Sequence, residues 1–313
     1  MKIVFFGSSE FSIPCLKALL NTQHQLICVV TQPDKQKGRG LNLGSTIVKE
    51  VAQEKNLNLY QPFQINNQES INFLKNLNPD LFVVIAYGQI LSKKILEIPK
   101  IFSLNVHASV LPKYRGACPI NWAIIQGEED TGISIIKMTE KMDAGPIILQ
   151  KKIKIRDDQI SIELEKELSS ISAELLIQVL DLIEKNNYKL IPQDESKVSF
   201  APKLKKEDGR IDWQQPAKKI YNLIRGLQPW PGTFTFYKGK MLKIYKASVS
   251  PSTNQFVNPS AGEIIEVSKR GIIVACGKDN LIIEELQIEG KKRISAEAFI
   301  AGYKIKPKEK FQP

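Results

Sequence analysis

Two patterns of hydrophobic and polar positions divide the chain near residue 187. In the first part, short apolar runs alternate with longer amphipathic stretches. Continuous Val-, Ile- and Leu-rich runs with helices between them are typical of a parallel sheet covered on both faces. The predicted strands are Lys2–Phe6, Leu26–Thr31, Asp80–Ala86, Ile101–Val106, Gly132–Lys137 and Pro146–Lys152. We therefore expect a doubly wound α/β domain here.

The clearest helix of this part covers Ser161–Asn186. Its apolar residues recur every three or four positions and so lie on one face. They are Leu164, Leu168, Ile171, Leu175, Val179 and Leu182. We place the first domain at residues 1–187 and a polar, proline-containing connector at 188–206.

After the connector the pattern changes to many short strand-like runs broken by glycine and proline. One helix, Ala217–Leu227, precedes them. The runs are Thr233–Tyr237, Leu242–Ala247, Gly262–Val267, Gly271–Cys276 and Asn280–Ile288. Short strands of this kind predict a small all-β barrel or sandwich over residues 207–313.

The composition is that of a globular protein, with 42% hydrophobic and 25% charged residues. The longest apolar runs, such as Leu81–Leu91, are about half of the ~20 residues that a membrane-spanning helix needs. The first residues show neither a secretory signal nor a transit peptide. We therefore expect a cytoplasmic protein with no membrane contact. The four cysteines are widely spaced and no histidine cluster accompanies them, so we expect no metal site.

The net charge of +11 is concentrated in the second part of the chain. Residues 1–200 hold 23 Lys and Arg against 22 Asp and Glu, whereas residues 201–313 hold 21 against 11. A strongly basic domain favours a polyanionic partner, usually nucleic acid. The alternative is a lysine-rich surface that is merely solvated.

The segment 31–46, TQPDKQKGRGLNLGST, is long, basic and rich in glycine. Its glycines nearly match a dinucleotide-binding fingerprint. However, the spacing is one residue too long, and the segment follows the second strand rather than the first. Two interpretations remain: a plain surface loop, or a mobile contact for nucleic acid.

Asn105 and His107 lie at the end of the predicted strand 101–106. Ligands of open parallel sheets bind at the carboxyl ends of strands. Alternation along an extended chain puts these two side chains on the same side, where an amide and an imidazole can converge on one reacting atom. The alternative is that they only satisfy backbone groups of the following loop.

Asp143 offers a carboxylate in a turn bordered by glycine and proline. Beside Asn105 and His107, a carboxylate would orient the imidazole and favour its charged form. Considered alone, an aspartate in a turn is usually only a turn residue.

The run SLNVHASVLPKYRGACPINWAI, residues 103–124, resembles the signature of the folate-dependent formyltransferases, as does the Asp143 turn, 36 residues after His107. Within that family, four stretches are similar to the methionyl-tRNA formyltransferases: MKIVFFGSSEFS, TQPDKQKGRG, QDESKVSFAPKLKKEDGRIDW and IRGLQPWPGTF. The resemblance covers nearly the whole chain. It departs at Val110, Cys118 and Ser8-Ser9, where leucine, alanine and Thr-Pro are usual.

The resemblance implies a Rossmann-like N-terminal domain and an OB-type (oligonucleotide-binding) C-terminal barrel in a monomer. The implied formyl donor is 10-formyltetrahydrofolate, and no metal takes part. The catalytic residues would be Asn105, His107 and Asp143. The implied folate-binding residues are Ser109, Val110, Leu111 and Pro112. By their strand-end position, Tyr87 and Gly88 would line the same site.

The implied acceptor is the α-amino group of initiator methionyl-tRNA, which becomes N-formylmethionyl-tRNA. Arg39 matches the family's functional arginine in a loop that enters the acceptor-stem region, and Lys35 and Lys37 lie beside it. The nearest alternative is a related formyltransferase that acts on a small amine, such as an amino sugar or a purine precursor. Such an enzyme has no evident need for the basic loop or the basic domain. A non-catalytic RNA-binding protein is a further alternative, which the intact catalytic residues argue against.

Overall fold

The protein is described by a computed structural model that covers residues 1–37, 42–251 and 259–312. The chain forms two compact units. The first contains residues 1–119, 130–154 and 165–201, and the second contains residues 120–129, 155–164 and 202–313. Residues 188–201 of the predicted connector are therefore packed in the first unit.

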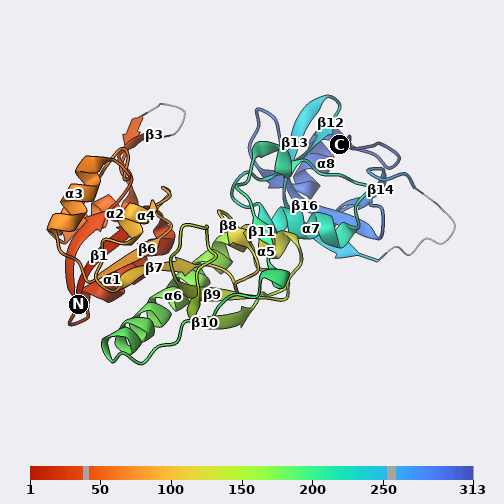
Figure 1. Ribbon diagram of the computed structural model, residues 1–313. Coiled ribbons are helices and arrows are strands. Elements are labelled where there is room, and N and C mark those ends of the chain that lie inside the picture. Colours follow the sequence, from red (N-terminus) through yellow and green to blue (C-terminus); the bar gives the residue numbers. More distant parts are fainter. Residues whose placement is uncertain (38–41, 252–258, 313) are drawn as a thin grey trace. The chain divides into compact units, whose positions relative to one another are not determined.

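The first unit is built on a seven-stranded mixed sheet (Figure 1). Across the sheet, the strands are β10 (Ile147–Lys154), β9 (Asp130–Lys137), β7 (Phe102–His107), β6 (Leu81–Ile85), β1 (Lys2–Gly7), β2 (Gln25–Val30) and β5 (Leu59–Tyr60). The five strands from β7 to β5 are parallel, which confirms the predicted α/β sheet.

One strand of this sheet, β9, departs from the predicted parallel arrangement. β9 pairs antiparallel with both β7 and β10. Only residues 138–146 join β9 to β10, and they contain no helix. A parallel connection needs a crossover of about a dozen residues or more, so this short link forces an antiparallel pair.

Helices cover both faces of this sheet. All residues of β6 are buried, as are Ile3–Phe6 of β1. One face packs against α3 (Gln68–Asn76) and α4 (Lys93–Leu96). α1 (Ile13–Leu20) lies against α6 (Ser161–Glu184), since the Cys15 thiol is hydrogen-bonded to Ser172. α2 (Ile47–Glu54) also belongs to the first unit, whereas α5 (Pro119–Ile125) lies almost wholly within the second.

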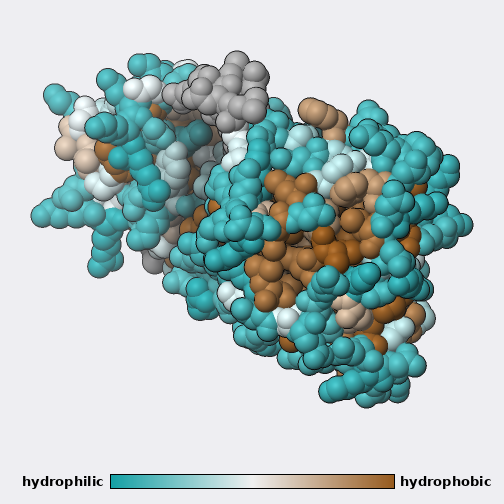
Figure 2. Space-filling model, turned by 90° about the vertical axis from the view of Figure 1, so that its left-hand side faces the viewer, coloured by the Kyte–Doolittle hydropathy of each residue, from teal (hydrophilic) through white to brown (hydrophobic). Residues whose placement is uncertain are grey.

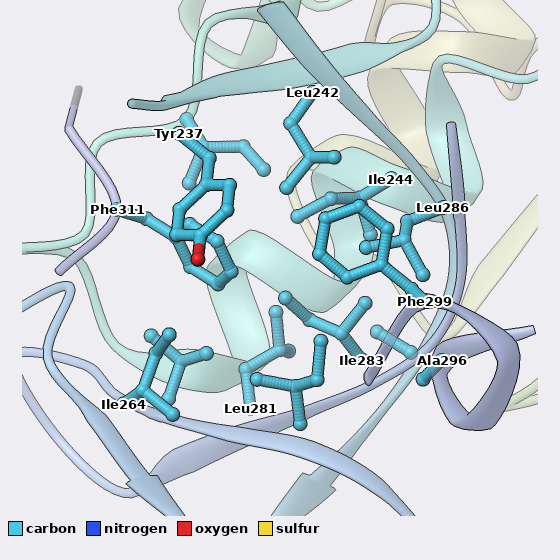
Figure 3. Packing of buried hydrophobic residues seen from close by; sticks show 14 of the residues in the cluster. Tyr237, Leu242, Ile244, Ile264, Leu281, Ile283, Leu286, Ala296, Phe299 and Phe311 are labelled. Atoms are coloured by element: carbon cyan, nitrogen blue, oxygen red, sulfur yellow. The ribbon is translucent and has the colours of Figure 1, made fainter. Parts of the chain in front are cut away.

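The second unit contains an antiparallel sheet, as the short runs predicted. Its strands lie in the order β12 (Thr233–Tyr237), β13 (Lys240–Ser250), β16 (Asn280–Ile288), β15 (Gly271–Ala275) and β14 (Ile264–Ser268), with β17 (Ile294–Ser295) beside β16. Its helices are α7 (Ala217–Gly226) and α8 (Ala296–Tyr303). Figure 3 shows the side chains of Tyr237, Phe299 and Phe311 packed among the aliphatic residues of the strands.

The C-terminal tail connects the two edges of this sheet. Phe236 of β12 exchanges two backbone hydrogen bonds with Gln312, at 3.0 and 2.9 Å. The backbone N–H of Phe311 donates to Gly262, just before β14, at 2.9 Å. Between these contacts, the Phe311 side chain is fully buried in the core. The tail therefore closes the sheet around its hydrophobic interior.

The surface is largely hydrophilic on the face drawn in Figure 2, where hydrophobic residues gather in one area. Within the part of the chain that the structure describes, no helix is both long and apolar enough to cross a membrane.

Candidate active site

β7 ends in the two polar side chains that the sequence singled out. The strand lies between β6 and β9, and Asn105 is paired with Val84 of β6. Asn105 is half-buried and His107 is buried. Because neighbouring strands hold β7 on both sides, its carboxyl end presents an amide and an imidazole in a fixed arrangement.

Asp143 contacts both side chains. Asn105 Nδ2 donates to Asp143 Oδ1 at 3.0 Å, and His107 Nδ1 lies 3.5 Å from Asp143 Oδ2. The second distance exceeds the ~3.2 Å limit of ordinary N–H···O hydrogen bonds and is a close electrostatic contact. Only 6% of the His107 side chain and 10% of the Asp143 side chain are exposed, so little water screens this contact. The three residues predicted to be catalytic thus form one cluster.

The second ring nitrogen of His107 is hydrogen-bonded to the protein backbone. Nε2 lies 2.9 Å from the backbone carbonyl oxygen of Tyr114. A carbonyl only accepts hydrogen bonds, so Nε2 carries a hydrogen and donates it. Nδ1 is then the nitrogen that faces Asp143, and it donates only when the ring is protonated on both nitrogens. A donor role for His107 in the reaction therefore falls to Nδ1.

The Asp143 carboxylate has a third partner in the backbone N–H of Gly116, which donates to Oδ2 at 2.9 Å. Gly116 adopts a φ of +128°, and a Cβ there would lie 2.6 Å from the carbonyl oxygen of Ala201. Only glycine fits such a close approach at positive φ. β8 (Arg115–Gly116) and β11 (Phe200–Ala201) are paired here in parallel.

The segment predicted to bind folate is fixed by Ser134 of β9. Its hydroxyl accepts from the backbone N–H of Leu111 at 3.0 Å and donates to the carbonyl oxygen of Ser109 at 2.6 Å. Ser109 and Leu111 are buried, whereas Val110 and Pro112 are half-buried. The side chains of Val110 and Pro112 are therefore the accessible ones of this segment.

Tyr87 and Gly88 differ in what they offer to a ligand. The Tyr87 side chain is buried and packs edge-on against Phe6, with the ring centroids 5.4 Å apart. Its carbonyl oxygen accepts from Ser8 Oγ at 2.9 Å, which joins the carboxyl ends of β6 and β1. Gly88 is exposed and has a φ of +89°. At this edge the protein presents the backbone of Gly88 rather than the ring of Tyr87.

The basic loop 31–46 contains a short hairpin of β3 (Lys35–Lys37) and β4 (Asn42–Gly44). Lys35 Nζ donates to Gln32 Oε1 at 3.0 Å. Arg39 lies outside the described residues, and so does the side chain of Lys37. Their predicted contact with tRNA stays a prediction.

Two residues next to the cluster were not predicted from the sequence. Arg115 lies in the run 103–124, where no role was assigned to it, yet its side chain is 2% exposed. Gln193, in the predicted connector, donates to the backbone carbonyl oxygens of Asp143 and Gly145 at 2.8 and 2.7 Å. An arginine is almost never buried without partners, but the sequence does not reveal that Arg115 is buried.

One group of residues in the described ranges could hold a metal ion: His24, Asp181 and Glu184. Both carboxylates are exposed. His24 precedes β2, at the amino end of a parallel strand, whereas Asn105 lies near the carboxyl end of β7. The group is therefore at the opposite edge of the sheet from the cluster. That the reaction needs no metal stays a prediction.

Comparison with known proteins identifies both parts of the chain. Residues 1–180 match the formyl transferase family, and residues 203–304 match the formyl transferase C-terminal domain. The methionyl-tRNA formyltransferase of Alkaliphilus oremlandii is 46% identical over 305 residues, which cover 97% of each chain. That of Geobacter sulfurreducens is 41% identical, over 98% of this chain and 95% of the relative.

Solved structures share the fold at much lower identity. WlaRD, a sugar 3N-formyl transferase, matches 93% of this chain and 99% of its own with a TM-score of 0.68 and 19% identity. HypX from Aquifex aeolicus, in complex with tetrahydrofolic acid, matches 99% of this chain and 48% of its own with a TM-score of 0.62 and 16% identity. The family matches over both parts and the near-complete overlap with close relatives show that the chain belongs to the formyl transferase family, among the methionyl-tRNA formyltransferases.

Proposed function

We propose that the protein transfers the formyl group of 10-formyltetrahydrofolate to the α-amino group of initiator methionyl-tRNA. The observation that carries this proposal is the cluster of Asn105, His107 and Asp143 in a chain 46% identical to a methionyl-tRNA formyltransferase. The sugar formyltransferases among the solved structures are less than 20% identical and support only the fold. A small amine is therefore not the preferred acceptor.

The chemical step begins when the neutral amine attacks the formyl carbon. A tetrahedral intermediate forms, and negative charge develops on the formyl oxygen. Asn105 Nδ2 and protonated His107 Nδ1 both lie against Asp143 and would donate to that oxygen from the same side. Each such donor is worth about 2.7–4 kcal/mol in comparable sites. The C–N bond to the folate nitrogen then breaks, and this nitrogen leaves with a proton.

Asp143 would accept the proton that the amine loses and pass it toward the folate nitrogen. Its carboxylate already accepts from Asn105 and from Gly116 N–H, and it pairs with His107. These contacts keep it oriented, so a proton from the attacking nitrogen has one defined acceptor on its way to the folate nitrogen. The charged His107 ring would be stabilised by the same carboxylate.

The folate would lie along the carboxyl ends of β1, β6 and β7. Val110 and Pro112 would contact it on one side, and the Gly88 backbone would approach it on the other. Near Gly88, the buried Nε2 of Gln32 has no hydrogen-bond partner in the described part of the chain, and it would lie 3.6 Å from a Cβ at Gly88. A buried donor without a partner is costly, so an acceptor on the bound donor molecule would satisfy it.

The tRNA would be held by the basic second part of the chain and by the loop around Arg39, Lys35 and Lys37. Several Lys–phosphate contacts give binding that weakens steeply as salt rises. Recognition would depend on the shape and the unpaired bases of the acceptor end. We place the protein in the cytoplasm, as a monomer without a metal.

Single-turnover transfer from 10-formyltetrahydrofolate tests this function. Charged initiator methionyl-tRNA is the acceptor, and free methionine is the control acceptor. We expect transfer to the tRNA and none to methionine. Transfer to neither, with folate still bound, would refute the tRNA acceptor and favour a small amine.

A further inference from the structure

The backbone of the Asp143 turn is held by a side chain 50 residues further along the chain. Gln193 Nε2 donates to the carbonyl oxygens of Asp143 and Gly145, at 2.8 and 2.7 Å. Gly145 is itself packed tightly, because a Cβ there would lie 1.8 Å from the carbonyl oxygen of Lys137. The Gln193 amide therefore binds the backbone on both sides of Ala144, the residue that follows Asp143.

Arg115 fixes which way this amide points. Its Nε and Nη2 donate to Gln193 Oε1 at 3.0 and 2.8 Å. A guanidinium only donates, so it must face the amide oxygen, and the amide nitrogen must then face the turn. Nη2 and Nη1 of Arg115 also donate to the Glu195 carboxylate, at 2.7 and 3.3 Å. The Arg115 side chain is 2% exposed, so little water reaches the guanidinium, although the Glu195 side chain is 59% exposed.

The same short stretch also holds the catalytic side chains directly. Tyr114 accepts from His107 Nε2 with its carbonyl oxygen, while its N–H donates to Ser199 Oγ at 2.9 Å. Gly116 donates to the Asp143 carboxylate. Residues 193–201 thus contact the two backbone segments, 114–116 and 143–145, that orient His107 and Asp143.

We propose that Gln193, aligned by Arg115, is a positioning residue for the Asp143 carboxylate. Asp143 has a φ of +51°, a region that few non-glycine residues adopt. With its backbone held from Gln193, the carboxylate is aimed at both Asn105 and His107. Without Gln193, the turn relaxes and the carboxylate loses this alignment, while the folate segment, fixed by Ser134, is unaffected.

This inference rests on the proposed formyl transfer, and the test separates the two. Gln193→Ala and the similarly sized Gln193→Glu, which places a carboxylate against two carbonyl oxygens, are compared with the wild type in single-turnover transfer. Gln68→Ala, which removes an exposed glutamine side chain on α3, is the matched control. The KM for 10-formyltetrahydrofolate and the melting temperature are measured for each.

We expect kcat to fall by up to ~100-fold in both variants, the loss that a misplacement of about 1 Å can cause. The KM for the formyl donor should stay as in the wild type, and Gln68→Ala should match the wild type throughout. In an Asp143→Asn background, Gln193→Ala should add little further loss, because Gln193 acts through Asp143.

Two results would overturn the inference alone: a wild-type rate in Gln193→Ala with only a lower melting temperature, or an equally large loss in the Asp143→Asn background. A folded wild-type protein that transfers no formyl group would overturn the proposed function, and this inference with it. If Gln193→Ala does not fold, the same comparisons are made with Gln193→Glu alone. In that variant a glutamate oxygen still faces Arg115.

Discussion

The Asp143 carboxylate lies 3.5 Å from Nδ1 of His107 and accepts a 3.0 Å hydrogen bond from Asn105. We predict that Asp143→Asn lowers kcat by about 10²–10³-fold, the range reported for removing one transition-state contact. The KM for the formyl donor should change little, because the folate segment does not depend on this carboxylate. Single-turnover kinetics with saturating donor measure both quantities.

Asp181→Asn is the control for the Asp143 variant, since it removes an exposed carboxylate on α6. It should behave as the wild type. An Asp143→Asn enzyme with a near-normal rate would contradict the assigned role.

Arg39 should act on the tRNA rather than on folate. We expect Arg39→Ala to lower kcat/KM for methionyl-tRNA by roughly 10- to 100-fold, because hydrogen bonds to charged groups contribute about 1.5–3 kcal/mol. Lys17→Ala, which removes an exposed charge on α1, should have no effect. Equal losses in the two variants, or a raised KM for the formyl donor in Arg39→Ala, would count against this contact.

Salt should weaken binding of the tRNA far more than binding of the formyl donor. For each phosphate that the basic part neutralises, the slope of log K against log salt is near −0.7 to −0.9. Binding of charged tRNA at several salt concentrations measures the slope. A flat line would show that the excess of Lys and Arg after residue 200 does not contact the RNA backbone.

Phe311→Ala should destabilise the second unit by about 3–5 kcal/mol, the usual cost of truncating a buried phenylalanine. Phe311 is fully buried, and its ring stacks on Trp213 with centroids 5.9 Å apart. Denaturant unfolding followed by tryptophan fluorescence reports the loss. Phe63→Ala is the matched control, because Phe63 is 86% exposed and its removal should change stability by less than about 0.5 kcal/mol.

Alkylation should distinguish the four cysteines. Burial raises the pKa of the Cys15 and Cys28 thiols to about 12, and burial likewise raises that of Cys276 to about 12. The thiolate is the reactive form, so these three residues should stay unreactive well below that pH and gain reactivity only as pH rises toward it. Cys118 is half-buried, and we expect iodoacetamide at pH 8 to label it first. Peptide mapping that finds Cys15 labelled as fast would contradict this.

The catalytic positions could be predicted because local signals mark them. Asn105 and His107 alternate at the end of a buried strand, and the carboxyl edge of a parallel sheet is where ligands bind. The reversed direction of β9 was not predicted, because apolar runs look alike in parallel and antiparallel strands. The shortness of the link 138–146 was the signal that β9 and β10 run in opposite directions.

No local signal in the sequence marks Gln193 as part of the site. A glutamine in a polar segment fits a solvated connector, and its partner Asp143 lies 50 residues earlier. The burial of Arg115 likewise follows only from the folded arrangement. The boundary drawn at residue 187 stays a prediction, although residues up to 201 are grouped with the first unit.

The position of Gln193 has a consequence for the order of events during synthesis. The strands and helices up to α6 leave the ribosome before residues 193–201 do, and domains tend to fold in that order. The nascent sheet would then carry Asn105, His107 and Asp143 before their alignment is complete. A competent site would arise only once Ala201 has emerged, when the start of the basic second part is already being made.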